Sequence, residues 1–512
     1  MEGAPAVAPA RIGRLWGIER LMKRETFSSR LGFILVSAGC AIGLGNVWKF
    51  PYMCGQYGGA VFILCYIVFL ALFGLPIIVC EFAVGRGSRQ SIATSFSTLA
   101  PRGTRWGQMS YFGLAGNYLL MMFYTMVAGW LVYYCVRTFG GAFNGADTAQ
   151  VAAAYSGMLQ SPGTMALWTV VVWALCLGVC ALGLENGVEK ITKVMMALLL
   201  AVMVLLGVRS VTLAGAGEGL RFYLVPDLEK VKEQGFAAIL YGAMNQSFFT
   251  LSVGIGSMAI FGSYMKKDRS ITGEAVRIIA LDTFVALTAG IIVIPACFAF
   301  GINPDSGPSL LFLTLPNVFS QMAGGQIWGG LFFLFMSFAA LSTVVAVYEN
   351  IISFGMDKWG WTRKKSVAIN GAALLVLSLP AVLGMNVWSG IQPLGATSNL
   401  REMEDFIVTN SLLPLGSVVF VLFCVRKNGW GWDNFLQEVN TGAGRKFPTW
   451  LRGYMGTVLP VAVGVIYIKG YYDTMVNVAQ ASVFRTVLWV LFGVFMVWFV
   501  ISTAFFPRRD SR

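Results

Sequence analysis

The stretch SAGCAIGLGNVWKFPYMCGQYGG, Ser37 to Gly59, interrupts a segment that is otherwise apolar enough to cross a membrane. It contains six glycines, one proline and one charged residue, Lys49. In a bilayer an unpaired backbone amide or carbonyl costs several kcal/mol, so irregular backbone is tolerated only where it is buried in protein or lines a cavity. The stretch therefore predicts a membrane fold with a site at the interruption.

The composition places the chain in a membrane. Of its 512 residues 57% are hydrophobic and 12% are charged, whereas soluble domains carry about 25% charged residues. The net charge of +13 comes from short basic clusters between apolar runs, which is typical of membrane topology rather than of a nucleic-acid-binding surface. We expect a lipid bilayer around the protein and no nucleic-acid partner.

Residue usage argues against an enzyme. The chain has no histidine, which excludes Ser-His-Asp and Cys-His nucleophilic sites and the commonest zinc ligand. Its nine cysteines lie in or beside apolar segments without CxxC spacing, which is typical of packing residues. We expect no organic cofactor.

Twelve apolar runs are long enough for a roughly 30 Å hydrocarbon core. Segments 216–235 and 303–323 are expected to be structured outer loops. The runs cover about 31–55, 60–86, 107–138, 164–184, 189–210, 236–265, 271–301, 324–356, 365–384, 404–426, 449–470 and 483–506.

Lys and Arg residues concentrate in alternate connections, which predicts the orientation. The chain is expected to be a multi-pass protein of a plasma (inner) membrane with both termini in the cytoplasm. The basic clusters assigned to the inside lie within 11–30, 86–105, 266–269, 358–365, 426–452 and 508–512.

The sixth run repeats the interruption of the first. NQSFFTLSVGIGSMAIFGSY (Asn245–Tyr264) contains Ser252, Gly254, Gly256 and Ser257 at its middle. One such segment is commonly a packing or kink glycine, but two in corresponding places of two five-helix blocks are typical of an inverted-repeat transporter.

Three charged residues in apolar surroundings support this interpretation. Lys49, Glu81 and Asp282 lie inside predicted spans, where a charge is costly and usually functional.

We predict an all-α polytopic membrane protein of about 12 transmembrane helices. A 5+5 inverted repeat, with helices 1 and 6 unwound at the midplane, forms its core. The predicted organisation is a cytoplasmic N-terminal segment with an inner gate (1–30), a transport core (31–426, helices 1–5 over about 31–210 and helices 6–10 over about 236–426), helices 11–12 (427–506) and a cytoplasmic tail (507–512).

Four stretches carry a family resemblance. RLGFILVSAGCAIGLGNVWKFPY, YGGAVFILCYIVFLALFGLPIIVCEFAVGR, FFTLSVGIGSMAIFGSY and FAALSTVVAVYENIISF resemble the neurotransmitter:sodium symporters, in one collinear order over about residues 24–430. The similarity is greatest to the bacterial amino-acid branch, with its tryptophan, tyrosine and leucine transporters. It implies symport of sodium and an amino acid by alternating access.

The resemblance also implies two sodium sites built from hard oxygen ligands. In the first site the substrate carboxylate completes the shell, which would couple the two ligands. The first sodium site would use Ala41, Asn46, Thr250 and Asp282, and the second Gly39, Ile42, Ala339, Ser342 and Thr343.

Chloride independence is expected, because chloride-dependent members have Asn at the position of Asp282 and Ser at that of Ala286. A fixed carboxylate can supply the negative charge that chloride would bring. The other anion-site positions of the family, Tyr66, Gln246 and Thr250, are present. Whether Asp282 or Glu81 takes up a proton during the return step stays open.

The substrate class is inferred from Gly43, where monoamine transporters carry an aspartate. With glycine there, the substrate should bring its own carboxylate, held by nearby backbone amides and the Tyr124 hydroxyl. Ile255 and Val347 are smaller than the Phe and Ile of the bacterial leucine transporter at these positions, which would leave room for an indole or phenol ring. The implied substrate residues are Cys40, Ala41, Gly43, Leu44, Gly45, Leu120, Tyr124, Phe249, Thr250, Ser252, Ile255, Thr343 and Val347.

Two pairs of charged residues are expected to act as gates. Lys49 and Asp405 would pair on the outside, and Arg24 and Asp357 on the inside. Phe27, where the family usually has Trp, and Tyr264 would pack beside the inner pair.

Tryptophan is the favoured substrate. Tyrosine, leucine or a broad set of neutral amino acids are the alternatives, because one methylene in an apolar pocket is worth only about 1–3 kcal/mol. An amino-acid sensor without transport, an embedded enzyme and a sodium symporter of another family are less favoured.

Overall fold

The structure is a computed structural model that describes residues 25–302, 304, 310–396, 398–478 and 481–506. Helices build these residues, and an isolated β-bridge joins Arg269 to Ala443. In the first half the helices are α2 (Arg30–Ala41), η1 (Gly45–Lys49), α3 (Phe50–Tyr57), α4 (Ala60–Phe69), η2 (Leu70–Gly74), α5 (Leu75–Ser88), α6 (Ser95–Leu99), η3 (Trp106–Gln108), α7 (Met109–Phe139), α8 (Thr148–Gln160), α9 (Pro162–Ala181), η4 (Leu184–Glu189), α10 (Lys190–Val211), α11 (Ala216–Leu224) and α12 (Leu228–Gln234).

The second half continues the same pattern of long helices with short connecting ones. Its elements are α13 (Phe236–Phe249), α14 (Ser257–Tyr264), α15 (Ile271–Ala299), η5 (Leu310–Thr314), α16 (Leu315–Gln321), α17 (Gly325–Trp359), α18 (Arg363–Leu377), α19 (Leu379–Gly384), α20 (Leu400–Ile407), η6 (Val408–Leu412), α21 (Leu413–Val425), α22 (Trp432–Val439), α23 (Leu451–Gly453), η7 (Tyr454–Val458), α24 (Leu459–Tyr472), η8 (Asp473–Val478) and α25 (Val483–Phe505).

Both predicted interruptions are present. Between α2 and η1 the first span breaks and bends by 57°. Between α13 and α14 residues 250–256 leave the helix, with φ of +50° at Ser252, +107° at Gly254 and +78° at Gly256. Because the left-handed region favours glycine, the two glycines explain why the helix breaks at this point.

The twelve predicted runs all coincide with helices or helix pairs. In the described chain, ten helices are long and apolar enough to cross a membrane, and an eleventh is added if the bent α2–α3 pair counts as one span. α13 and α14 have 14 and 8 residues, so each is too short to cross alone. The count of twelve crossings stays a prediction.

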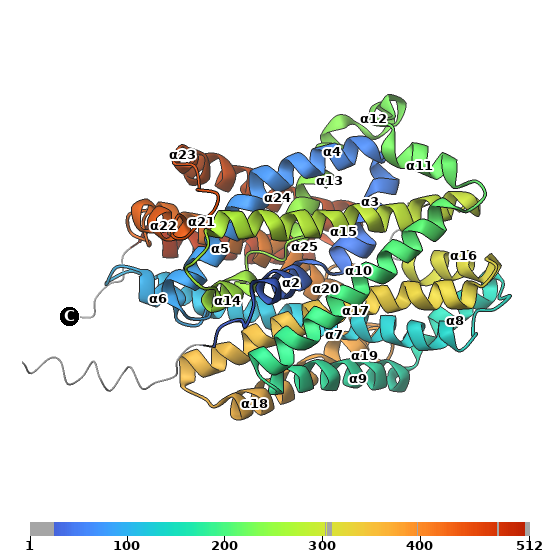
Figure 1. Cartoon of the computed structure of the whole chain (residues 1–512), viewed down its shortest axis with the longest axis horizontal. Helices are drawn as coiled ribbons and strands as arrows, with labels where there is room; N and C mark the ends of the chain where they lie inside the picture. Colours follow the sequence, from blue (N-terminus) through green and yellow to red (C-terminus); the bar gives the residue numbers. More distant parts are fainter. Residues whose placement is uncertain (1–24, 303, 305–309, 397, 479–480, 507–512) are drawn as a thin grey trace, which may run out of the picture.

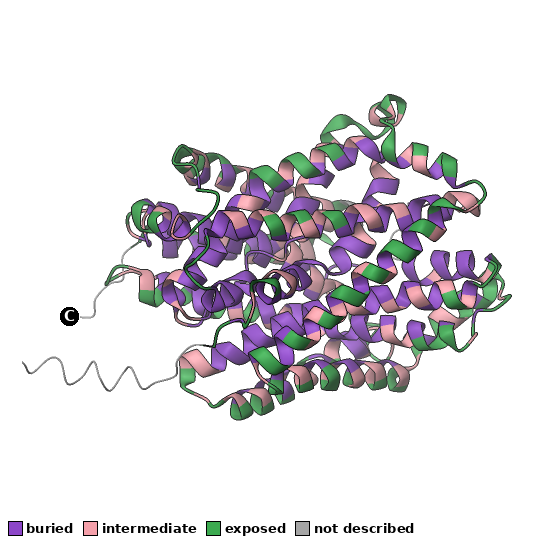
Figure 2. Cartoon of the chain, in the orientation of Figure 1, coloured by how far each residue is buried: buried purple, intermediate pink, exposed green. Residues whose placement is uncertain are grey.

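Packing between the two halves is reciprocal. The helix pair α4–α5 packs against the broken helices α13 and α14, and α15 packs against α2, η1 and α3. The second helix of each predicted block thus supports the broken helix of the other, as an inverted repeat requires. The long helices α7 and α17 pack along their length at the centre (Figure 1). Helices α9, α10 and α25 expose much of their apolar surface, which can be seen for α9 and α10 in Figure 2.

Short helices mark the two ends of the bundle. α8, α11 and α16 lie at one end, and α6 and α22 lie at the other, on the left in Figure 1. Three of the predicted inner connections, 86–105, 266–269 and 426–452, meet at that left end. Buried Arg86 of the first donates 2.7 Å hydrogen bonds to Glu438 of the third and to the Arg269 carbonyl of the second. Helix α8 is an addition that the sequence analysis does not predict, whereas α11, α12 and α16 lie in the predicted outer loops.

Candidate sodium and substrate site

The two breaks are held by carboxylates from neighbouring helices. Glu81, on α5, accepts hydrogen bonds from the amides of Gly254 and Met258 (3.1 Å for Met258), at the start of α14. Asp282, on α15, faces the break of the first span through Asn46. Both carboxylates are buried, so each intramembrane acid noted in the sequence supports one broken helix.

The predicted first sodium site brings together three polar side chains from three elements. Asn46 Nδ2 donates to Thr250 Oγ1 (2.9 Å) and to Asp282 Oδ1 (2.9 Å). Thr250 Oγ1 donates to Asp282 Oδ2 at 3.0 Å. All three side chains are at most 1% exposed. The Thr250 hydroxyl and the Asp282 carboxylate are hard oxygen groups that suit an alkali cation, whereas the Asn46 oxygen accepts from the Gly43 amide.

The predicted second sodium site joins α17 to the first break. Ser342 Oγ donates to the carbonyls of Gly39 (2.9 Å) and Ala339 (3.0 Å). Thr343 Oγ1 lies 3.3 Å from the carbonyl oxygens of Gly39 and Ile42 and 3.2 Å from that of Ala339. All five predicted ligands therefore contribute oxygens to one small volume.

The anion-site positions that the resemblance implies lie in or beside the first cluster. Tyr66 donates to Thr250 Oγ1 at 3.4 Å, and Gln246 Nε2 donates to the Gly45 carbonyl at 2.8 Å. Ala286 is buried in the same helix as Asp282. Asp282 contributes its carboxylate group to this cluster.

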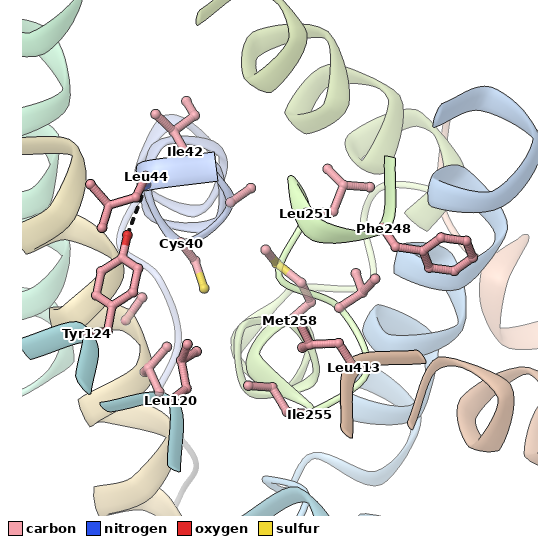
Figure 3. Packing of buried hydrophobic residues seen from close by; sticks show 14 of the residues in the cluster. Cys40, Ile42, Leu44, Leu120, Tyr124, Phe248, Leu251, Ile255, Met258 and Leu413 are labelled. Atoms are coloured by element: carbon pink, nitrogen blue, oxygen red, sulfur yellow. Dashed lines mark hydrogen bonds between the residues drawn. The ribbon is translucent and has the colours of Figure 1, made fainter. Parts of the chain in front are cut away.

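The backbone of the first break faces Tyr124. The amide of Leu44 donates to the Tyr124 hydroxyl at 3.1 Å, the dashed line in Figure 3. A Cβ added at Gly43 would lie 2.6 Å from that hydroxyl oxygen and 2.9 Å from Thr343 Oγ1. The amide of Gly43 donates to Asn46 Oδ1 at 3.2 Å, so the predicted carboxylate-binding amides and a predicted sodium ligand touch.

The predicted pocket side chains come from different helices. In Figure 3 Leu120 and Tyr124 lie on one side, Ile255 lies on the other, and the Cys40 sulfur points between them. Cys40, Leu120, Tyr124, Ile255, Thr343 and Val347 are buried, and Phe249 and Ser252 are half-buried. The walls are apolar apart from hydroxyl groups.

A cavity of about 220 Å³ opens above Tyr124 and Phe249, lined by Lys49, Arg401 and Asp405 among others. The two residues of the predicted outer gate, Lys49 and Asp405, contact other groups instead of each other. Lys49 Nζ lies 3.9 Å from the centre of the Phe249 ring, and Asp405 Oδ1 accepts a 2.8 Å hydrogen bond from Thr409. Among the described residues no ion pair within 4.0 Å joins Lys49 to Asp405; Lys49 makes a cation–π contact with the Phe249 ring instead.

On the predicted inner side, Arg24 lies outside the described residues. Asp357 accepts a 2.6 Å hydrogen bond from the amide of Ser91. Phe27 is buried, and its ring centre lies 5.8 Å from that of Tyr264, as expected.

A network of ion pairs and hydrogen bonds on this side is not predicted by the sequence. Arg363 bonds to Glu349 at 2.8 Å and to Glu25 at 3.1 Å, and Tyr264 donates to Glu349 at 2.8 Å. Its one sequence signal is Glu349, an acidic residue inside the apolar run 324–356.

Known proteins resemble this chain over most of its length. The profile of the sodium:neurotransmitter symporter family matches residues 24–150 and 148–506. The uncharacterized sodium-dependent transporter YhdH of Bacillus subtilis is 34% identical over 87% of this chain and 98% of its own length. The sodium-dependent serotonin transporter of Drosophila melanogaster is 26% identical over 88% of this chain and 78% of its own length.

A solved structure shares the fold. The crystal structure of MhsT in complex with L-phenylalanine superposes with a TM-score of 0.76 at 34% identity, covering 88% of this chain and 100% of that one. The relatives are transporters rather than enzymes. With a matching family profile, relatives above 30% identity and paired broken helices, this chain belongs to the sodium:neurotransmitter symporter family.

Proposed function

We propose that the protein is a sodium-coupled symporter of a neutral amino acid with a large apolar or aromatic side chain, tryptophan being favoured. The observation that carries this proposal is the buried cluster of Asn46, Thr250 and Asp282, which joins both breaks. In an apolar interior such a set of oxygens needs a cation or internal hydrogen bonds to offset its burial.

Binding of sodium and binding of the amino acid would be coupled because their proposed sites are adjacent. The amides that would hold a substrate carboxylate and the Asn46 oxygen that would bind sodium belong to residues 43–46 of one unwound segment. Each ligand would therefore stabilise the arrangement that the other needs, and linkage makes the effect reciprocal.

The substrate class rests on Gly43 and the apolar walls. The space next to Gly43 is limited by the Tyr124 hydroxyl, which favours a carboxylate supplied by the substrate. A relative with 34% identity binds L-phenylalanine, and Ile255 and Val347 leave room for a larger ring. Tyrosine, leucine or several neutral amino acids are the alternative substrates.

Two sodium ions and no chloride are the proposed co-substrates. The oxygens around Ser342 and Thr343 supply the second cation site, and Asp282 supplies the charge that chloride would otherwise bring. Lys49, Asp405 and Phe249 would close the outside, and Asp357 with Arg24 the inside, in an alternating-access cycle. We place both termini in the cytoplasm and the protein in a plasma membrane, from its Lys and Arg distribution.

Equilibrium binding of labelled tryptophan to the purified protein, in sodium compared with choline, tests the proposal. Unlabelled amino acids compete for the site. Sodium-dependent binding displaced best by tryptophan is the expected result. Better displacement by leucine or alanine would retain the mechanism and reject the pocket assignment, and binding that ignores sodium would reject the assignment of Asn46, Thr250 and Asp282.

A further inference from the structure

Three polar side chains meet in the interior beneath the proposed substrate pocket. They are Asn117 on α7, Ser257 at the start of α14 and Asn350 on α17, each at most 1% exposed. Asn350 Nδ2 donates to Asn117 Oδ1 at 3.0 Å, and Ser257 Oγ donates to the same oxygen at 3.3 Å.

Of the side-chain oxygens in this group, one amide oxygen, that of Asn350, does not receive a hydrogen bond from the described residues. The Asn117 amide nitrogen donates to the carbonyls of Gly113 (2.7 Å) and Ile255 (2.8 Å), so Asn117 uses both donors and its oxygen receives two. Asn350 Oδ1 is buried, and no hydrogen-bond donor reaches it from the described residues. Rotating the Asn350 amide by 180° would bring its oxygen against the Asn117 oxygen, which is unfavourable. A buried carbonyl without a donor is rare in native proteins and calls for a ligand or a water molecule.

The group lies directly below the pocket walls. Asn117 comes three residues before Leu120, and Asn350 comes three residues after Val347, so each lies about 4.5 Å further along its helix. The two helices are antiparallel, because Thr125 bonds to Tyr348 and Cys135 to Gly330 in the opposite direction along the chain. Both asparagines are therefore displaced toward the same side, where the Ile255 carbonyl joins them.

We propose that Asn350 Oδ1 accepts a hydrogen bond from a donor at the far end of the substrate ring, such as an indole N–H or a phenol O–H. This inference rests on the proposed amino-acid site and adds a specificity-determining residue to it. An apolar pocket discriminates weakly between rings of similar size, whereas a polar group placed to bind a substrate N–H or O–H penalises the analogue that lacks it.

The test compares two ligands of nearly equal shape on the unmodified protein. Tryptophan and 3-(3-benzothienyl)alanine, in which sulfur replaces the indole N–H, are measured by sodium-dependent equilibrium binding. Tyrosine and phenylalanine form a second pair that distinguishes a phenol donor from an indole donor. We expect about tenfold tighter binding of the donor-bearing member in at least one pair, which is the upper end of what one neutral hydrogen bond contributes.

Two variants assign the effect to Asn350. In Asn350→Leu the affinity difference within that pair should fall to about twofold or less, while phenylalanine binding changes little. The matched control is Asn370→Leu, since Asn370 is also a buried asparagine but its oxygen already accepts a 2.5 Å hydrogen bond from Tyr118. The control should keep the tenfold difference.

Equal binding within both pairs on the unmodified protein would overturn the inference, whether or not the variants fold. The same holds if Asn350→Leu weakens every ligand alike or keeps the difference. The proposed function fails separately, and the inference with it, if none of these amino acids binds in a sodium-dependent manner.

Discussion

Gly43 shows how a missing side chain shapes the proposed site. An alanine Cβ there would lie within 3.0 Å of the Tyr124 and Thr343 oxygens. Overpacking of this kind costs about 1–3 kcal/mol, so Gly43→Ala should weaken amino-acid binding at least fivefold. Gly178→Ala on α9 is the control, because no atom of the part of the chain that the structure describes lies within 4 Å of its added Cβ. Equal affinities in the two variants would contradict the placement of the carboxylate next to Gly43.

Asp282 is expected to determine the chloride requirement. Two unit charges about 4 Å apart attract by about 4 kcal/mol at an effective dielectric constant of 20. In Asp282→Asn, sodium-dependent binding in chloride-free gluconate medium should therefore fall more than tenfold, and added chloride should restore part of it. The unmodified protein should bind equally well in both media.

Glu404→Gln provides the control for that substitution. Glu404 is also a buried carboxylate, 1% exposed on α20, but it is not a predicted sodium ligand. Its variant should remain sodium-dependent and insensitive to chloride. An Asp282→Asn protein that binds normally in gluconate would show that the carboxylate is not next to the cation.

At the scale of helices, the breaks could be predicted from the sequence and several contacts could not. Glycines within apolar runs indicate both breaks. At the second break Ser252, Gly254 and Gly256 adopt positive φ, which favours glycine; at the first, a Cβ on Gly43 would meet the Tyr124 and Thr343 oxygens. The group of Asn117 and Asn350 and the pair of Glu349 and Arg363 depend on how each helix rotates about its axis. That rotation is set by packing between distant segments, and an asparagine within an apolar run does not reveal it.

The same limit applied to the outer gate. The sequence predicts that Lys49 and Asp405 pair; in the structure both line one cavity, but the ammonium group lies over the Phe249 ring. Because the lysine side chain has a flexible four-carbon stem, its ammonium group can contact either a carboxylate or an aromatic face from the same backbone position.

The start of α14 is expected to depend on Glu81. This carboxylate accepts hydrogen bonds from the Gly254 and Met258 amides at a helix N-terminus, where negative charge is stabilising. Hydrogen bonds to a charged group contribute about 1.5–3 kcal/mol each. Glu81→Gln should therefore lower the midpoint of thermal unfolding in detergent by several degrees and weaken amino-acid binding. Glu229→Gln, at an exposed residue of α12, should leave both unchanged; a Glu81→Gln protein of normal stability would contradict this role.

For the whole molecule, the predicted topology can be tested with single exposed cysteines. Ala149 on α8 and Gln437 on α22 are both exposed and lie at opposite ends of the bundle (Figure 1). If the basic connections are cytoplasmic, a membrane-impermeant maleimide should label Ala149→Cys in intact cells and Gln437→Cys only after permeabilisation. The parent protein, with its nine native cysteines, measures background labelling. The reverse pattern would invert the orientation.

The two proposed cation sites together predict the driving force of transport. Two sodium ions that move with a zwitterion carry two charges, worth roughly 4.6 kcal/mol at 100 mV, which supports roughly a thousandfold accumulation; one ion supports about fiftyfold. Proteoliposomes should therefore show two charges moved per amino acid.

The hydroxyls of Ser342 and Thr343 lie within hydrogen-bond distance of the Gly39 and Ala339 carbonyls in the proposed second site. Since Ser342→Ala removes one of these oxygens, it should reduce sodium affinity at that site. Ser337→Ala, whose hydroxyl bonds within α17 to Phe333, should not. A ratio of one sodium ion per amino acid, measured as uptake of labelled sodium by the unmodified protein, would mean that the oxygens around Ser342 do not bind a transported cation.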